Sequence, residues 1–293
     1  MRSEQEMFDL ILGVANKDER IRAVYMNGSR TNPNAPKDIF QDYDIVYVVT
    51  ETESFLRDEK WIDVFGERLM MQEPDKNDQA VGIETHYERT YIYLMLFTDG
   101  NRIDLRLQTK GAMLDTYLED SLTVPLLDKD SILPPIAPPI DSSYYVKQPT
   151  EAEFMNCCNE FWWCQQNVAK GIWRDELSYA KHMYELTSRA PLDEMVSWWI
   201  GMKYDFKVST GKMGKYFNMY LPTEYWEMYT ATYSNANYEQ MWDSIFVTCE
   251  LFRTLAQEVA AAFSYTYRLE DDTNMTAYLT RMRDLPEAAQ EIY

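Results

Sequence analysis

The sequence predicts an α+β domain with a mixed β-sheet and flanking helices, followed by an all-α helical bundle. Two observations support this division. Short β-rich runs occur almost entirely in the first half of the 293 residues, and five prolines fall between residues 133 and 151. Proline fixes φ and lacks a backbone N–H, so this segment favours an extended connector. We therefore expect domains over residues 1–135 and 150–293, joined by a linker over 136–149.

The first half combines one amphipathic helical pattern with four β-rich runs. The helix is expected from about Glu4 to Asn16, and the runs read IRAVYMNGS, DYDIVYVVT, TYIYLMLF and RIDLRLQ. TDGN at 98–101 joins the last two runs, and its Asp-Gly pair predicts a hairpin. Helical segments near 53–66 and 109–119 alternate with these strands, so helices should flank the sheet.

Strand patterns nearly disappear after the linker. Segments with helical length and spacing lie at 150–170, 174–188, 192–205, 222–231 and 237–264. We expect the aromatic side chains of these segments to fill the core of the bundle. They include Phe161, Trp162, Trp163, Trp198 and Trp199.

The chain is strongly acidic. It has 28 Lys and Arg against 48 Asp and Glu, a formal net charge of −20 at pH 7. Such a surface repels phosphate backbones, so no nucleic-acid partner is expected, whereas a cationic small molecule would be attracted. No apolar run approaches the roughly 20 residues that span a bilayer. The start MRSEQEMFDL also lacks the pattern of a signal peptide, so we expect a cytoplasmic protein without a membrane partner.

Histidine and cysteine are too scarce to suggest a metal site built from Cys and His ligands, or nucleophilic catalysis that depends on histidine. The only histidines, His86 and His182, stand alone, and the four cysteines form no CxxC pair. If the protein carries out chemistry, carboxylates are expected to perform it.

Residues 25–49, YMNGSRTNPNAPKDIFQDYDIVYVV, are the most informative. An apolar run leads into Gly28 and Ser29, which allow close backbone approach and a hydroxyl contact to a phosphate. A second run begins with Asp42 and Asp44, which share one face of a strand. Two adjacent carboxylates suggest Mg²⁺ bound together with substrate phosphates, and Asp104 on a later strand could bind the metal or accept a proton. Alternatively, the Asp pair only opens a strand at a solvated edge.

Together these motifs resemble the nucleotidyltransferase superfamily of polymerase-β type. Within it, NGSRTNPNAPKDIFQDYDIVYVV and LMLFTDGNRIDLRL resemble the aminoglycoside 6-adenylyltransferases, which modify streptomycin. The resemblance implies Mg²⁺-dependent transfer of AMP from ATP to a hydroxyl of a cationic aminoglycoside such as streptomycin, and hence antibiotic resistance. It implies that Asp42 and Asp44 are metal ligands, and that Asp104 is the third carboxylate and general base. Ser29 would contact a phosphate, and Arg30 could do the same.

The second half carries one further resemblance. STGKMGKY at 209–216 resembles a Thr-Gly-Lys segment near the ATP phosphates in related streptomycin-modifying enzymes. It implies Lys212 or Lys215 as a triphosphate contact and Asp193 as a ligand for a substrate cation. Alternatively, the lysines belong to a solvated loop and Asp193 is an ordinary acid near a helix N-terminus.

Two other functions stay open from the sequence. One is adenylylation of a different acceptor, either a protein or another small molecule. The other is a non-catalytic nucleotide-binding protein, which would have no need of Asp42, Asp44 and Asp104 together. The sequence gives no indication of an oligomeric state.

Overall fold

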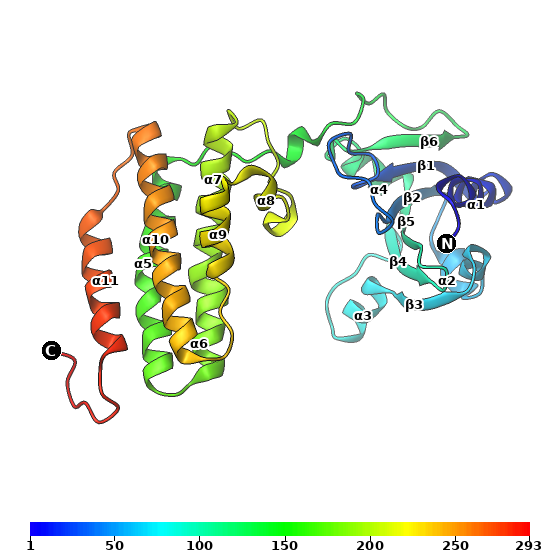
Figure 1. Cartoon of the computed structure of the whole chain (residues 1–293). Coiled ribbons are helices and arrows are strands. Elements are labelled where there is room, and N and C mark those ends of the chain that lie inside the picture. The colour runs from blue at the N-terminus through cyan, green and yellow to red at the C-terminus, as the bar shows by residue number, and fades with distance from the viewer. The chain divides into compact units, whose positions relative to one another are not determined.

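The computed structural model describes all 293 residues and divides the chain into two compact units, Met1–Ser143 and Tyr144–Tyr293. All β-strands lie in the first unit, and the second is built from helices (Figure 1). The predicted fold class is therefore confirmed. The boundary between the units falls within the proline-containing segment 133–151. None of the helices combines the length and the apolar character that crossing a bilayer requires.

The strands of the first unit form one sheet in the order β3-β4-β5-β2-β1-β6. β2 and β5 run parallel and all other neighbours run antiparallel, so the sheet is mixed. The elements in the first half of the chain are α1 (Glu4–Lys17), β1 (Ile21–Asn27), β2 (Tyr43–Val49), α2 (Glu53–Arg57), η1 (Trp61–Phe65), β3 (Arg68–Gln72), α3 (Pro74–Ala80), β4 (Thr90–Phe97), β5 (Arg102–Thr109), α4 (Lys110–Thr116), β6 (Val124–Asp128) and η2 (Asp141–Tyr144).

Local sequence explains where several of these elements begin and end. α1 starts at Glu4 because Ser3 and Glu6 form a capping box, in which each side chain binds the other residue's backbone N–H. The helix predicted over 53–66 is instead α2 followed by the 3₁₀ helix η1. The Asp58 carboxylate accepts a hydrogen bond from the backbone N–H of Lys60 (3.2 Å), which favours a turn between the two helices.

Two edge strands, β3 and β6, are absent from the prediction. β3 reads RLMMQ and lacks an alternating apolar pattern, and both Leu69 and Met70 are exposed. β6 contains Pro125, which argues against a central strand but is tolerated at the edge of a sheet.

The two faces of the sheet are covered differently. On one face, α1 and the residues around Phe55 and Phe65 pack against alternate residues of β1, β2, β4 and β5. On the other face, Met113 and Tyr117 pack against side chains of β1 and β2, including Tyr25 and Val46. The second cluster includes no residue of β4 or β5; on this face of β5, Gln108 is buried against Tyr25, whereas Arg102 and Arg106 are exposed.

The second unit is the predicted helical bundle. At its core, the rings of Phe161 and Phe252 stack with centroids 3.7 Å apart. Trp162, Trp198 and Trp199 are buried as expected, but Trp163 is 63% exposed, since it lies on the outer face of its helix. The elements are α5 (Glu151–Trp173), α6 (Leu177–Met183), the π-helix η3 (Tyr184–Ser188), α7 (Arg189–Lys203), η4 (Lys212–Gly214), α8 (Phe217–Tyr220), α9 (Thr223–Ala231), α10 (Tyr238–Phe263) and α11 (Leu269–Arg283).

The break predicted between residues 188 and 192 does not occur. Helical structure continues from Leu177 through a π-helical turn to Lys203. Pro191 cannot donate a hydrogen bond to a carbonyl in the preceding turn, and a change to π geometry just before it accommodates that missing bond.

Candidate active site

Three carboxylates meet where β2 and β5 begin. Asp44 in β2 lies opposite Asp104 in β5, because the two strands are parallel and pair in that register. Asp42 precedes Asp44 by two residues, and the Arg102 guanidinium contacts both Asp42 and Asp104. Side chains alternate along a strand, so these acids point away from the face that α1 covers. The structure thus brings together the three acids that the sequence singled out.

The negative charge of this cluster is only partly compensated. Burial, and then the charges of Asp104 and Asp42, raise the pKa of Asp44 to about 6. The pKa of Asp42 is also raised, chiefly by burial, although the positive charge of Arg102 opposes the shift. A raised pKa means that the ionised carboxylate is unfavourable in its surroundings. These oxygens would therefore stabilise a cation placed among them.

Arg102 is the counter-ion in this structure. Its Nε and Nη2 donate to the two carboxylate oxygens of Asp104 at 2.8 and 2.7 Å. Its Nη1 lies 3.3 Å from an oxygen of Asp42. Such two-point contacts between guanidinium and carboxylate are among the stronger ion pairs in proteins.

The donor set fits a hard divalent cation. Carboxylate oxygens are the ligands that Mg²⁺ prefers, and Asp44 forms no ion pair with a basic side chain, whereas Asp42 and Asp104 share Arg102. They do not form a ready-made cage, since no group of three or more Asp, Glu, His or Cys side chains is arranged to hold a metal. Both oxygens of Asp104 are bound by Arg102. Cation binding at all three acids therefore requires a side chain to move.

The loop after β1 passes directly over Asp44. Gly28 has φ of +79°, and a Cβ added to it would lie 2.0 Å from Oδ2 of Asp44. Only glycine fits there, because both the backbone conformation and the space exclude a side chain. The next residue, Ser29, is partly exposed, and its backbone carbonyl accepts a hydrogen bond from the Gln41 side chain at 3.2 Å. Ser29 thus directly follows the residue whose backbone lies against the Asp44 carboxylate.

The Arg30 side chain anchors the loop after β1 to the segment that precedes β2. Its Nε and Nη2 donate to the backbone carbonyls of Asp42 (3.0 Å) and Gln41 (2.8 Å), and its Nη1 pairs with Glu4 at 3.3 Å. The guanidinium also lies 3.8 Å from the ring centre of Tyr43. With all three nitrogens engaged, Arg30 holds the loop in this structure and does not offer a free guanidinium to a phosphate.

The remaining predicted site residues belong to the second unit. Lys212 and Lys215 flank a tight turn in which Gly214 has φ of +70°, and both side chains are exposed. Lys215 lies 5.0 Å from the ring centre of Tyr216. Asp193 lies in α7 and accepts a hydrogen bond from the Tyr229 hydroxyl at 2.8 Å. Burial raises the pKa of Asp193, while this hydrogen bond and a nearby arginine oppose the shift.

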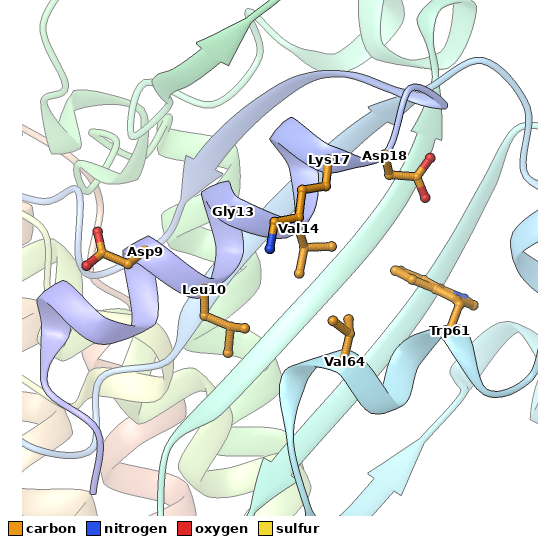
Figure 2. A pocket seen from close by; sticks show the side chains of 8 residues that line it. All are labelled: Asp9, Leu10, Gly13, Val14, Lys17, Asp18, Trp61 and Val64. Carbon is orange, nitrogen blue, oxygen red and sulfur yellow. The ribbon is translucent and has the colours of Figure 1, made fainter.

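Two cavities in the first unit lie on the other face of the sheet from the carboxylates. Figure 2 shows one of about 380 Å³, in which Leu10 and Val14 of α1 face Trp61 and Val64. A second, of about 400 Å³, is lined by tyrosines that include Tyr91. Trp61 and Tyr91 pack with the core that α1 covers, so neither cavity contains the acid cluster.

Comparisons with known proteins assign this arrangement to a family. A family model described as streptomycin adenylyltransferase matches residues 1–282. The chain belongs to the streptomycin adenylyltransferase family. This result confirms the family resemblance on which the sequence analysis relied.

Relatives of this adenylyltransferase cover nearly its whole length. An "Aminoglycoside 6-adenylyltransferase" of Campylobacter jejuni is 42% identical over 286 residues, which is 97% of this chain and 96% of that protein. A protein of the same name from Bacillus subtilis (strain 168) is 41% identical over 280 residues, or 95% and 97% of the two chains. A crystal structure of an aminoglycoside 6-adenyltransferase from Bacillus subtilis matches with 35% identity, 97% and 99% coverage and a TM-score of 0.48.

Two charged groups of the adenylyltransferase near the predicted sites were not among the predicted site residues. Asp120 accepts a hydrogen bond from the Leu122 backbone N–H at 2.9 Å, and its charge contributes to the raised pKa of Asp44. Arg189 is buried beside Asp193, and its Nη2 donates to the Tyr229 hydroxyl at 3.3 Å. No sequence motif marks Asp120, whereas Arg189 four residues before Asp193 is a spacing that places both on one side of a helix.

Proposed function

We propose that the enzyme transfers AMP from ATP to a hydroxyl of an aminoglycoside, with Mg²⁺ as the metal and the 6-hydroxyl of streptomycin as the acceptor. The observation that carries this proposal is the cluster of Asp42, Asp44 and Asp104 under the Gly28 turn, in a chain of the streptomycin adenylyltransferase family. Such a reaction in the cytoplasm would give resistance to the antibiotic.

Asp42 and Asp44, together with Asp104, are the proposed metal ligands. When bound, Mg²⁺ neutralises charge on the nucleotide phosphates. Gly28 lets the phosphates approach the backbone closely, and the Ser29 hydroxyl donates a hydrogen bond to one of them. These residues hold the nucleotide so that its α-phosphorus faces the acceptor.

Asp104 is the proposed general base. As the acceptor oxygen forms its bond to the α-phosphorus, its proton passes to a carboxylate oxygen of Asp104. The bond between the α-phosphorus and the bridging oxygen breaks, and pyrophosphate leaves with that oxygen. Most of the rate enhancement would come from positioning and from charge compensation, as in other phosphate transfers.

The second unit is proposed to supply contacts to both substrates. Lys212 and Lys215 are exposed cations in an otherwise acidic protein, which suits the triphosphate. Asp193 is held by the Tyr229 hydroxyl and is proposed to bind a cationic group of the acceptor. Streptomycin carries two guanidinium groups, which bind carboxylates well in partly buried sites. Arg30 would contribute by fixing the loop that carries Ser29.

The test is pyrophosphate release from ATP and Mg²⁺ with streptomycin, spectinomycin, kanamycin or no acceptor, using Asp42→Asn as control. We expect release only with streptomycin and only with Asp42 present. Release with another acceptor, and not with streptomycin, would show that the enzyme adenylylates a different substrate. Silence with every acceptor, with ATP binding intact, would refute aminoglycoside adenylylation and favour a protein acceptor or a non-catalytic role.

A further inference from the structure

The contacts of Arg102 suggest a function beyond neutralising charge. Arg102 stands two residues before Asp104 in β5, so both side chains point to the same face of the sheet. Its guanidinium uses Nε and Nη2 on Asp104 and Nη1 on Asp42. Every nitrogen that it offers is therefore turned to an oxygen of the proposed metal ligands.

Arg102 can leave this position at little structural cost. Its side chain is 43% exposed, and the cluster of carboxylates supplies all its ion pairs. Arg253 in the second unit differs, since its side chain is 23% exposed and also binds the Thr276 hydroxyl at 3.0 Å. An exposed arginine whose only ion pairs are with one group of carboxylates can rotate into solvent once another cation binds those carboxylates.

A metal ion and the Arg102 guanidinium compete for the same oxygens. Asp104 has both oxygens engaged by Arg102, and a divalent cation at those oxygens would also be repelled by the guanidinium charge. Without Arg102, the three adjacent negative charges of Asp42, Asp44 and Asp104 would lose the guanidinium that contacts them, and only the weaker effect of Arg30 on Asp42 would oppose them. The arginine thus stabilises the metal-free cluster and weakens its attraction for a metal.

We propose that Arg102 is a displaceable counter-ion, which occupies the carboxylate cluster in the substrate-free enzyme and moves away when a divalent cation binds. The proposal rests on the proposed function, since it takes these acids to be metal ligands. In this role Arg102 lowers the affinity of the carboxylate cluster for a metal ion in the absence of nucleotide. The metal then binds best together with a nucleotide, because the phosphates bring further ligands and negative charge.

The experiment is a titration of the full-length, nucleotide-free protein with Mn²⁺, in which free Mn²⁺ is measured by electron paramagnetic resonance. The variants are Arg102→Gln and, as matched control, Arg106→Gln. Arg106 lies on the same strand and face, two residues beyond Asp104, and takes part in none of the cluster's ion pairs. The double variant Arg102→Gln/Asp44→Asn corrects for Mn²⁺ bound elsewhere on this acidic protein.

We expect Arg102→Gln to bind one Mn²⁺ about tenfold more tightly than the wild type, and Arg106→Gln to match the wild type. The double variant should lose the added site. Arg102→Lys keeps the charge but cannot form two hydrogen bonds to the two oxygens of Asp104, so its Mn²⁺ affinity should lie between those of the wild type and Arg102→Gln. Without metal, Arg102→Gln should melt at a lower temperature than the wild type, and Mn²⁺ should raise its melting temperature by more.

Two results overturn the inference in distinguishable ways. If the wild type binds Mn²⁺ at a site that requires Asp44, and Arg102→Gln binds it no more tightly, Arg102 is not a competing counter-ion while the proposed metal site stands. If no variant binds Mn²⁺ at a site requiring Asp44, either in this titration or in a repeat of it with ATP present, the metal assignment itself fails and the role of Arg102 fails with it.

Discussion

Replacement of Gly28 by alanine tests whether the turn over Asp44 is essential to the site. A Cβ at this position would lie 2.0 Å from Oδ2 of Asp44, and real Cβ atoms essentially never come within 3.0 Å of such an atom. The carboxylate or the loop must therefore shift by about 1 Å. A displacement of about 1 Å in a catalytic group can lower the rate by about a hundredfold.

The control for Gly28→Ala is Gly82→Ala. Gly82 has a similar φ of +85°, but an added Cβ there would meet nothing within 4 Å. Both variants impose the left-handed conformation on alanine, which costs roughly 1–2 kcal/mol of folding free energy. The difference between them isolates the contact with Asp44.

We expect kcat/KM for acceptor-dependent pyrophosphate release to fall by about a hundredfold or more in Gly28→Ala and to stay within about twofold in Gly82→Ala. Urea unfolding should show a loss of roughly 1–2 kcal/mol for Gly82→Ala, and at least as much for Gly28→Ala. Near-normal kcat/KM in Gly28→Ala, or an equal loss in both variants, would refute the argument that the turn positions Asp44.

Three further outcomes are expected. Asp44→Asn should abolish metal-dependent pyrophosphate release and yet leave the metal-free protein at least as stable as the wild type, because it removes one of three adjacent charges; a clearly lower melting temperature would contradict this reasoning. Asp193→Asn should raise KM for streptomycin about tenfold or more while KM for ATP stays constant, since a charge-assisted contact would be lost; an unchanged acceptor KM would remove Asp193 from the site. Asp99→Asn should lower the free energy of unfolding by about 1 kcal/mol at pH 7. Burial raises the pKa of Asp99, but hydrogen bonds from Arg2 and Asn101 outweigh that effect and hold the pKa well below its usual range. That stabilisation is present above the unfolded pKa near 4 and is lost as pH falls, so melting curves of Asp99→Asn and the wild type should converge at low pH; a constant difference would argue against an electrostatic origin.

The face of the sheet on which the acids lie could be predicted from the sequence, because it follows from strand alternation, whereas the pairing of β2 with β5 that sets Asp104 opposite Asp44 is a long-range contact. Asp42 and Asp44 share a face through strand alternation, and Asp104 alternates with apolar residues in the same way. The position of Arg102 could be placed on that face too. Its choice of partners could not, because a flexible side chain selects among several carboxylates through tertiary geometry that no local pattern records.

The errors in the predicted elements also have local causes. β3 carries exposed methionine and leucine at the sheet edge, so neither alternation nor burial marks it as a strand. A proline usually signals the start of a helix. Pro191 instead lies within a continuous helical segment, because the π-helical turn at Tyr184–Ser188 adapts the backbone before it. In both cases the local sequence is compatible with more than one conformation.

The parallel pairing of β2 with β5 has a consequence for how the enzyme folds. Asp44 and Asp104 are paired across 60 residues of chain, whereas β4 and β5 are joined through residues 98–101 alone. Closing the longer segment costs more entropy, and contacts between distant residues form slowly. We therefore expect the β4–β5 hairpin to form early in refolding and the acid cluster to assemble only when β2 docks beside it. Recovery of activity should then lag behind recovery of secondary structure.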